Sequence, residues 1–178
     1  APHGGATIEF TGQSPENADT DFQLEGSPAA EPSLQSMATW DDSEQMERLL
    51  RFRMEQAYET LREAKILLRE SALRGAVNRA YYAMFYALMA VLATKRLGAS
   101  KHSGALALFD RQFVKPGLFT RDLSRSLHLA FERRQMNDYG EMVPTTSQMA
   151  EEALADAEAF LAAIDSYLQS LSNKGLSS

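Results

Sequence analysis

Cysteine is absent from this chain of 178 residues. Its absence excludes disulfide bonds, thiolate metal sites and cysteine nucleophiles, and it favours a cytoplasmic location. Long apolar runs are also missing, because the longest, from Ala80 to Ala93, has 14 residues, whereas a helix needs about 20 to cross a bilayer. No membrane contact is therefore expected. The first ten residues carry neither a basic nor an apolar signal-peptide region, so no secretory signal is visible.

Motifs for the common hydrolase and kinase chemistries are missing as well. The chain has no glycine-rich phosphate loop and no nucleophile elbow, and these motifs position phosphates and serine nucleophiles. From residue 37 onward the only histidines are His102 and His128; neither has metal-ligand spacing, so no metal and no cofactor are expected. His128 lies three residues after Arg125 and four before Glu132, which predicts an ion-paired surface residue. His102 follows Lys101 in a predicted loop, where the pair could contact an anion.

Lysine and arginine are absent from residues 1–36, which hold six acidic residues, four of the six prolines and four of the ten glycines. This acidic leader shows no helical period and is predicted to be disordered or tag-like, with a native disordered tail as the alternative. Residues 37–178 are predicted to form one helical domain. Within it, residues 95–134 hold nine basic and three acidic residues, and this excess of positive charge favours an anionic ligand.

Apolar residues recur every three or four positions and predict five helices, with no strand signal. Their approximate ranges are 43–72, 73–97, 103–114, 121–139 and 145–171. The second helix is apolar around nearly its whole circumference and should lie at the centre. Gly98 is the expected C-terminal capping residue of this helix, and Thr145 with Gln148 has the spacing of a capping box. The predicted fold is all-α, an up-and-down four-helix bundle with an additional short helix.

Polar residues interrupt the apolar second helix at one place. Asn78, Arg79 and Tyr82, with Tyr86 one turn further along, place an amide, a guanidinium and two phenols on neighbouring turns. Burying such groups unpaired costs about 1 to 3 kcal/mol each, so they need partners or a cleft. Either Arg79 pairs with a carboxylate of the bundle and the tyrosines belong to the core, or the set lines a binding site.

A second polar set ends the fourth helix, where Arg134 and Asp138 are four residues apart and Tyr139 follows. Residues at this spacing lie on one side of a helix. The arginine could hold a phosphate with its planar fork, and the tyrosine could stack on a base or donate a proton. The alternative is an ordinary ion pair on the helix surface, worth about 0.3 to 0.5 kcal/mol.

Three ordered blocks resemble the HEPN family, specifically its small stand-alone prokaryotic branch. The blocks are the segments 78–87 (NRAYYAMFYA), 101–104 (KHSG) and 134–140 (RQMNDYG). The resemblance implies a helical bundle that forms a homodimer, with the fourth-helix motifs of two subunits in a shared cleft. It also implies binding of RNA or a nucleotide, a toxin-like role beside a minimal nucleotidyltransferase, and metal-independent endoribonuclease activity.

On this resemblance, Arg134 engages the scissile phosphate, and the catalytic residues are Arg134, Asp138 and Tyr139. Asn78, Arg79 and Tyr82 line the site, and Lys101 and His102 approach it. The sequence departs from the family motif at one position, because Tyr139 stands where many members have histidine. A tyrosine, with an ordinary pKa near 10, is a poor general base at neutral pH, and His102 could replace the histidine only if its segment folds over the cleft. Two alternatives remain: a non-catalytic module that binds a nucleotide or a protein, and a purely structural helical adaptor.

Overall fold

The computed structural model describes residues 42–139 and 144–175, so the predicted leader lies outside the described part. Within these ranges the chain is helical and contains no strand. A short π-helical turn, Asp110–Val114, continues α3 directly. The five α-helices are α1 (Asp42–Arg69), α2 (Leu73–Ala93), α3 (His102–Phe109), α4 (Arg121–Tyr139) and α5 (Ser147–Gly175).

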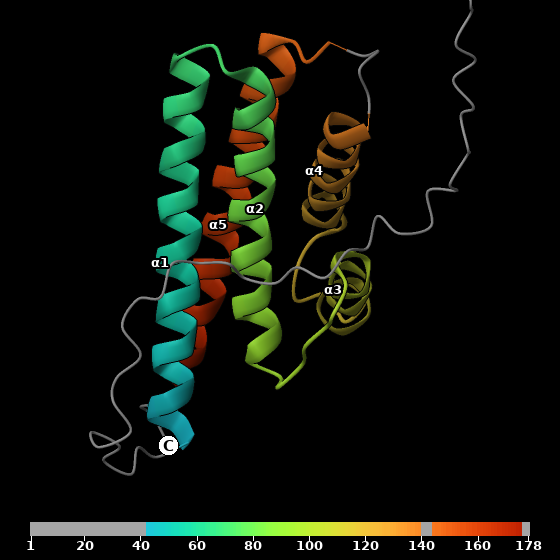
Figure 1. Ribbon diagram of the computed structural model, residues 1–178. Coiled ribbons are helices and arrows are strands. Elements are labelled where there is room, and N and C mark those ends of the chain that lie inside the picture. Colours follow the sequence, from blue (N-terminus) through green and yellow to red (C-terminus); the bar gives the residue numbers. More distant parts are fainter. Residues whose placement is uncertain (1–41, 140–143, 176–178) are drawn as a thin grey trace, which may run out of the picture.

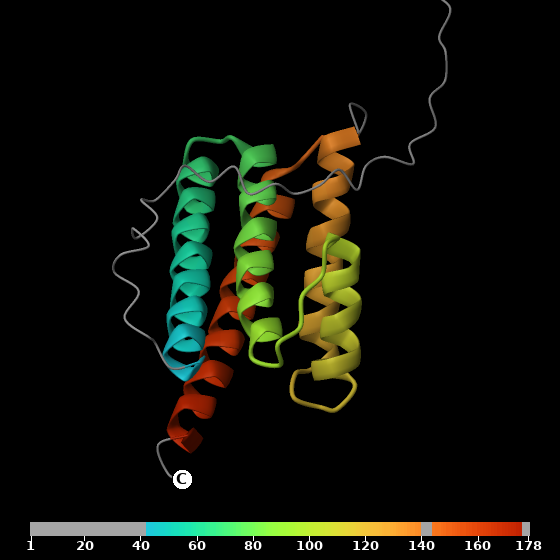
Figure 2. The same cartoon turned by 60° about the horizontal axis from the view of Figure 1, so that its bottom comes forward.

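The four long helices alternate in direction and form an up-and-down bundle, as predicted (Figure 1). Helix α2 contacts α1, α3, α4 and α5, and so occupies the centre. Helix α4 lies beside α2 on the side away from α1, with α3 next to its first half (Figure 2). This arrangement brings α3 and α4 onto the same side of the central helix.

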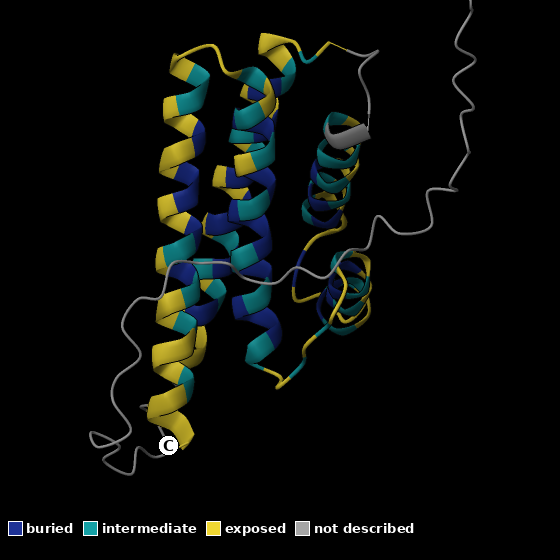
Figure 3. Cartoon of the chain, viewed as in Figure 1, coloured by how far each residue is buried: buried dark blue, intermediate teal, exposed yellow. Residues whose placement is uncertain are grey.

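Burial follows the apolar pattern of each helix (Figure 3). Helix α1 buries one stripe, whereas α2 buries residues on most of its circumference. A stripe of small residues along α2 is completely buried: Ala76, Ala80, Ala83, Ala87 and Ala90. Small side chains allow the backbones of neighbouring helices to approach closely, which explains why the central helix is rich in alanine. None of the described helices is long and apolar enough to span a bilayer.

The alanine stripe should tolerate no enlargement. Ala83 has no exposed surface, so a leucine at this position must displace a neighbouring helix. We expect Ala83→Leu to lower the free energy of unfolding by about 1 to 3 kcal/mol, measured by urea denaturation. Ala155→Leu, on the exposed side of α5, is the matched control and should change stability by less than about 0.5 kcal/mol. Equal stability of both variants would show that α2 is not tightly packed.

Several predicted helix ends were wrong. Helix α2 ends at Ala93, and the left-handed residue after it is Arg96, with φ 55°, rather than Gly98. The amide of Leu97 then donates to the carbonyl of Leu92, which completes the cap without glycine. At the start of α5, Thr146 rather than Thr145 accepts a hydrogen bond from the amide of Met149, at 3.2 Å. The capping residues are therefore Arg96 and Thr146, rather than the predicted Gly98 and Thr145.

Candidate functional site

Three helices meet around the ring of Tyr82, a half-buried residue of α2. The guanidinium carbon of Arg134, from α4, lies 5.7 Å from the centroid of this ring. The ring of His102, from α3, stands perpendicular to it with the two centroids 6.1 Å apart. A guanidinium beside an aromatic ring is attracted to the ring by a cation–π interaction. Tyr82, His102 and Arg134 form what we name the Tyr82 cluster.

His102 is anchored by the aromatic residues below the cluster. Its Nδ1 is hydrogen-bonded to the hydroxyl of Tyr81 at 2.7 Å, and Phe85 stacks on its ring with the centroids 4.2 Å apart. The predicted loop position was wrong, because His102 is the first residue of α3. His102 packs against three aromatic residues of α2, and the approach of its segment to a cleft between two subunits stays a prediction. Lys101 precedes it and is exposed.

Tyr81 is the buried residue on which this arrangement rests. Its side chain has no exposed surface, and burial raises the pKa of Tyr81 far above its ordinary value, while the charge of Arg134 acts in the opposite direction. The phenol therefore stays protonated at neutral pH and remains a hydrogen-bonding partner for His102. Tyr81 packs in the core, and its hydroxyl gives it a second role in orienting the histidine.

An open hollow of about 410 Å³ adjoins the Tyr82 cluster on the α1–α2 face. Three of its lining residues, Asn78, Arg79 and Tyr82, were predicted as binding residues. The others are Leu67, Gly75 and Tyr86. Tyr82 belongs to both features and links them. The rings of Tyr82 and Tyr86 have centroids 6.5 Å apart, so two phenols line this hollow side by side.

Arg79 pairs with a carboxylate of the bundle, as one of the two alternatives predicted. Its Nε lies 3.2 Å from Glu63 of α1, and both side chains are about half exposed at 49% and 48%. An ion pair with this exposure contributes little to stability because water screens it. It therefore leaves Arg79 at the rim of the hollow, where an anion could compete with Glu63.

Asn78 connects α2 to the end of α4. Its side-chain oxygen accepts a hydrogen bond from Asn137 at 3.3 Å, and the backbone carbonyl of Asn137 accepts another from Arg74 at 2.7 Å. The hydroxyl of Thr145 donates to the side-chain oxygen of Asn137 at 3.0 Å. These contacts fix the turn of α4 that follows Arg134. Asn137 was not among the predicted site residues, although it lies three residues after Arg134 in the segment 134–140.

Two neighbouring arginines on α4 serve different helices. Arg133 is mostly buried, with 12% of its side chain exposed, and binds Glu152 of α5 at 2.8 Å. This hydrogen bond lowers the pKa of Glu152. Arg134 lies about 100° further round the helix and points to Tyr82 instead. Arg133 thus ties α4 to α5, which steadies the helix that presents Arg134.

The other two predicted catalytic residues, Asp138 and Tyr139, belong to the last turn of α4. Their side chains lie outside the described part of the structure, so their predicted convergence with Arg134 stays a prediction. His128 is paired, as predicted, although its partner is Asp110 of the π-helical turn, at 2.8 Å. Among the described residues, no group of histidine, aspartate and glutamate side chains is arranged to hold a metal ion.

Comparison with known proteins identifies the family of this chain. The HEPN domain model matches residues 50–167. A UPF0332 protein of Thermotoga maritima is 41% identical over 125 residues, which cover 70% of this chain and 95% of that protein. A Methanocaldococcus jannaschii protein named "Putative toxin MJ0605" is 33% identical over 138 residues, which cover 78% of this chain and 99% of its own.

A solved structure agrees with the fold. The crystal structure of TT1696 from Thermus thermophilus superposes with a TM-score of 0.57 at 24% identity, over 66% of this chain and 97% of that one. The family match includes the segments that supply Tyr82, His102 and Arg134. The chain therefore belongs to the HEPN family.

Proposed function

We propose that this protein binds RNA at the Tyr82 cluster and acts as the toxin-like half of a pair with a minimal nucleotidyltransferase. The observation that carries the proposal is that Arg134 of α4 and His102 of α3 both lie beside the ring of Tyr82 of α2. A guanidinium that holds a phosphate and an imidazole that transfers a proton are two groups that phosphodiester cleavage can use.

Arg134 would bind a phosphate of the RNA backbone. Its guanidinium is a planar fork of donors that matches two phosphate oxygens, and it lies beside the ring of Tyr82. The hollow beside it offers Tyr82 and Tyr86 as surfaces for bases, and stacking on aromatic rings contributes about 1 to 3 kcal/mol per base. The site would thus combine one phosphate contact with sequence-tolerant stacking.

Cleavage at this site would depend on His102, because Tyr139 stands where other family members have the motif histidine. In the reaction, the ribose 2′-oxygen attacks the phosphorus and loses its proton to a base. The bond from phosphorus to the 5′-oxygen breaks, and that oxygen takes up a proton. The products are a 2′,3′-cyclic phosphate and a 5′-hydroxyl. Since Nδ1 of His102 is bonded to Tyr81, proton exchange would run through Nε2.

The proposed toxin-like role is supported by the names of relatives and not by the geometry of the site. Two Methanocaldococcus jannaschii relatives carry the word toxin in their names, at 33% and 32% identity. A homodimer that faces two copies of Arg134 across a shared cleft would double the positive charge presented to RNA. A nucleotidyltransferase partner would then neutralise the toxin by covering or modifying this cleft.

RNA binding by variants at Arg134 tests the proposal. We expect the wild-type chain to bind single-stranded RNA without metal, and Arg134→Ala to weaken binding about 10- to 100-fold, because a hydrogen bond to a charged group contributes about 1.5 to 3 kcal/mol. Arg134→Lys, which keeps the charge and loses the planar fork, should lie between them. Fluorescence anisotropy with labelled RNA in EDTA measures these affinities.

The matched control is Arg62→Ala, which removes an exposed arginine of α1 that pairs with Glu59 at 3.8 Å. It should bind RNA like the wild type, and equal weakening by both variants would contradict a specific role for Arg134. Gel analysis of the same RNA tests cleavage, which His102→Gln should abolish while binding persists.

A non-catalytic nucleotide-binding module is the second candidate. It is favoured by the fixed position of His102, whose ring is stacked on Phe85 and bonded to Tyr81, because such anchoring also suits a purely structural residue. In that case calorimetry should detect nucleotide binding that depends on Arg134, and the RNA should stay intact in the gel assay. RNA loss that disappears in Arg134→Ala would decide for the nuclease.

A further inference from the structure

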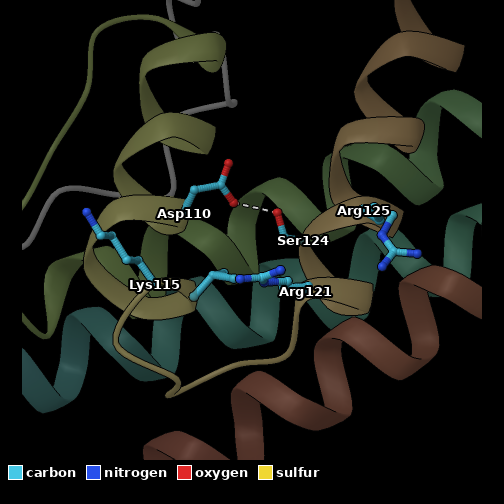
Figure 4. A pocket seen from close by; sticks show the side chains of 6 residues that line it. Asp110, Lys115, Arg121, Ser124 and Arg125 are labelled. Carbon is cyan, nitrogen blue, oxygen red and sulfur yellow. Dashed lines mark hydrogen bonds between the residues drawn. The ribbon is translucent and has the colours of Figure 1, made fainter.

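We propose that a second pocket, at the start of α4, binds a phosphate monoester at the end of an RNA or on a free ribonucleotide. The pocket has a volume of about 410 Å³ and lies between the π-helical turn and the first turns of α4 (Figure 4). Its lining residues are Asp110, Val114, Lys115, Arg121, Ser124 and Arg125. The choice of a ribonucleotide as the carrier of the phosphate rests on the proposed function, whereas the phosphate site itself rests on the pocket.

The cations of this pocket are available to a ligand. Lys115 and Arg121 are exposed, and neither forms an ion pair with any side chain that the structure describes. Arg125 pairs with Asp122 of its own helix at 3.0 Å, but both side chains are about four-fifths exposed, at 78% and 84%. A pair this exposed is weak, so Arg125 can exchange its partner for a bound anion.

The one carboxylate in the pocket is already engaged. Ser124 donates a hydrogen bond to Oδ1 of Asp110 (Figure 4), and Nε2 of His128 lies 2.8 Å from Oδ2. Both oxygens of Asp110 are therefore held by residues of α4 rather than by the three cations. The pocket keeps a positive balance although it contains an acid.

A phosphate monoester fits this arrangement better than a backbone phosphate. It carries up to two negative charges and three strong acceptor oxygens, which match several cations around one hollow, whereas a diester carries one charge. The pocket opens at the first turn of α4, where the helix dipole adds positive potential. Its volume exceeds that of a phosphate and lies within the range of about 300 to 1,000 Å³ for small-molecule sites, which leaves room for part of a sugar beside Val114.

This pocket is separate from the Tyr82 cluster. Arg121 and Arg134 are 13 residues apart on α4, which corresponds to about 20 Å along the helix. They also project in directions that differ by about 140° around the axis. One phosphate cannot contact both arginines. A mutation in one site should therefore leave binding at the other site unchanged.

Paired RNAs test the pocket. We expect a short oligoribonucleotide with a 5′-phosphate to bind about 10-fold more tightly than the same RNA with a 5′-hydroxyl, measured by anisotropy of a 3′ label. Arg121→Ala and Lys115→Ala should each remove most of this preference. Arg111→Ala is the matched control, because Arg111 is exposed on the same turn but does not line the pocket, and the preference should survive it.

Arg134→Ala separates this site from the proposed function. It should weaken both RNAs equally and leave the preference for the 5′-phosphate intact. If Arg111→Ala removes the preference as strongly as Arg121→Ala, the effect is diffuse attraction to a basic surface and the pocket assignment is overturned.

A nucleotide titration decides the matter even if no RNA binds. Adenosine 5′-monophosphate should shift the amide resonances of residues 110–125 in NMR spectra, adenosine should not, and Arg121→Ala should abolish the shifts. Shifts without an RNA preference would identify a free nucleotide as the ligand, and an RNA preference without shifts would identify an RNA end. If the folded wild-type protein shows neither the shifts nor the RNA preference, the proposed site is overturned.

Discussion

Replacing Phe160 with alanine is expected to lower the free energy of unfolding by about 3 to 5 kcal/mol, as is usual for a completely buried phenylalanine. Phe160 of α5 has no exposed surface, and its ring centroid lies 5.7 Å from that of Phe109 of α3. Phe109 in turn contacts Phe113 of the following turn. The loss would be a large share of the total stability of a typical domain, about 5 to 15 kcal/mol.

The reason is the cavity that alanine would leave between α5 and the α3 segment. Phe52→Ala, which makes the same substitution at a site that is 53% exposed, is the control and should cost less than about 0.5 kcal/mol. Urea denaturation of both variants measures the difference. A similar loss in the two would mean that α3 does not pack on α5 in solution.

Alkaline pH should destabilise the fold through Tyr81. Burial raises the pKa of Tyr81 far above its ordinary value of 10.0, so the folded protein keeps the phenolic proton while the unfolded chain releases it. The stabilisation is complete below pH 10 and is lost as pH rises through the interval between the two pKa values. Above pH 10 the loss approaches about 1.4 kcal/mol per pH unit.

Tyr81→Phe isolates this effect from the titration of lysines. At neutral pH the variant loses its hydrogen bond to His102 and should be about 1 kcal/mol less stable than the wild type. Above pH 10 its stability should fall less steeply, by about 1.4 kcal/mol per pH unit, so the two curves should converge and cross. Parallel curves from pH 9 to 12 would contradict a raised pKa for Tyr81.

Sequence periodicity predicted the elements of this fold well. The apolar residues around nearly the whole circumference of α2 identified it as the central helix. This pattern is local, because the spacing of apolar residues within one helix reveals which side it buries. The helix ends were less predictable. A positive φ at Arg96 depends on how the following loop returns to the bundle, and the composition of the loop favoured Gly98 instead.

The site was only partly predictable. Sequence blocks selected Arg134, Tyr82 and His102, but nothing in their spacing showed that one ring would join them. That contact depends on α3 and α4 packing on the same side of α2. Arg133 and Arg134 are adjacent in sequence and equivalent in chemistry, and only the tertiary structure assigned one to Glu152 and the other to Tyr82.

The sequence alone determined the helices, the central position of α2, the family resemblance and the basic character of residues 95–134. The tertiary structure decided that His102 lies against α2, that Asp110 is bonded to Ser124 and His128, and that Lys115 and Arg121 line a common pocket. The physical reason is that helix formation depends on residues three and four positions apart. The contacts named here join residues that are between 6 and 21 positions apart, and they form only when whole helices pack.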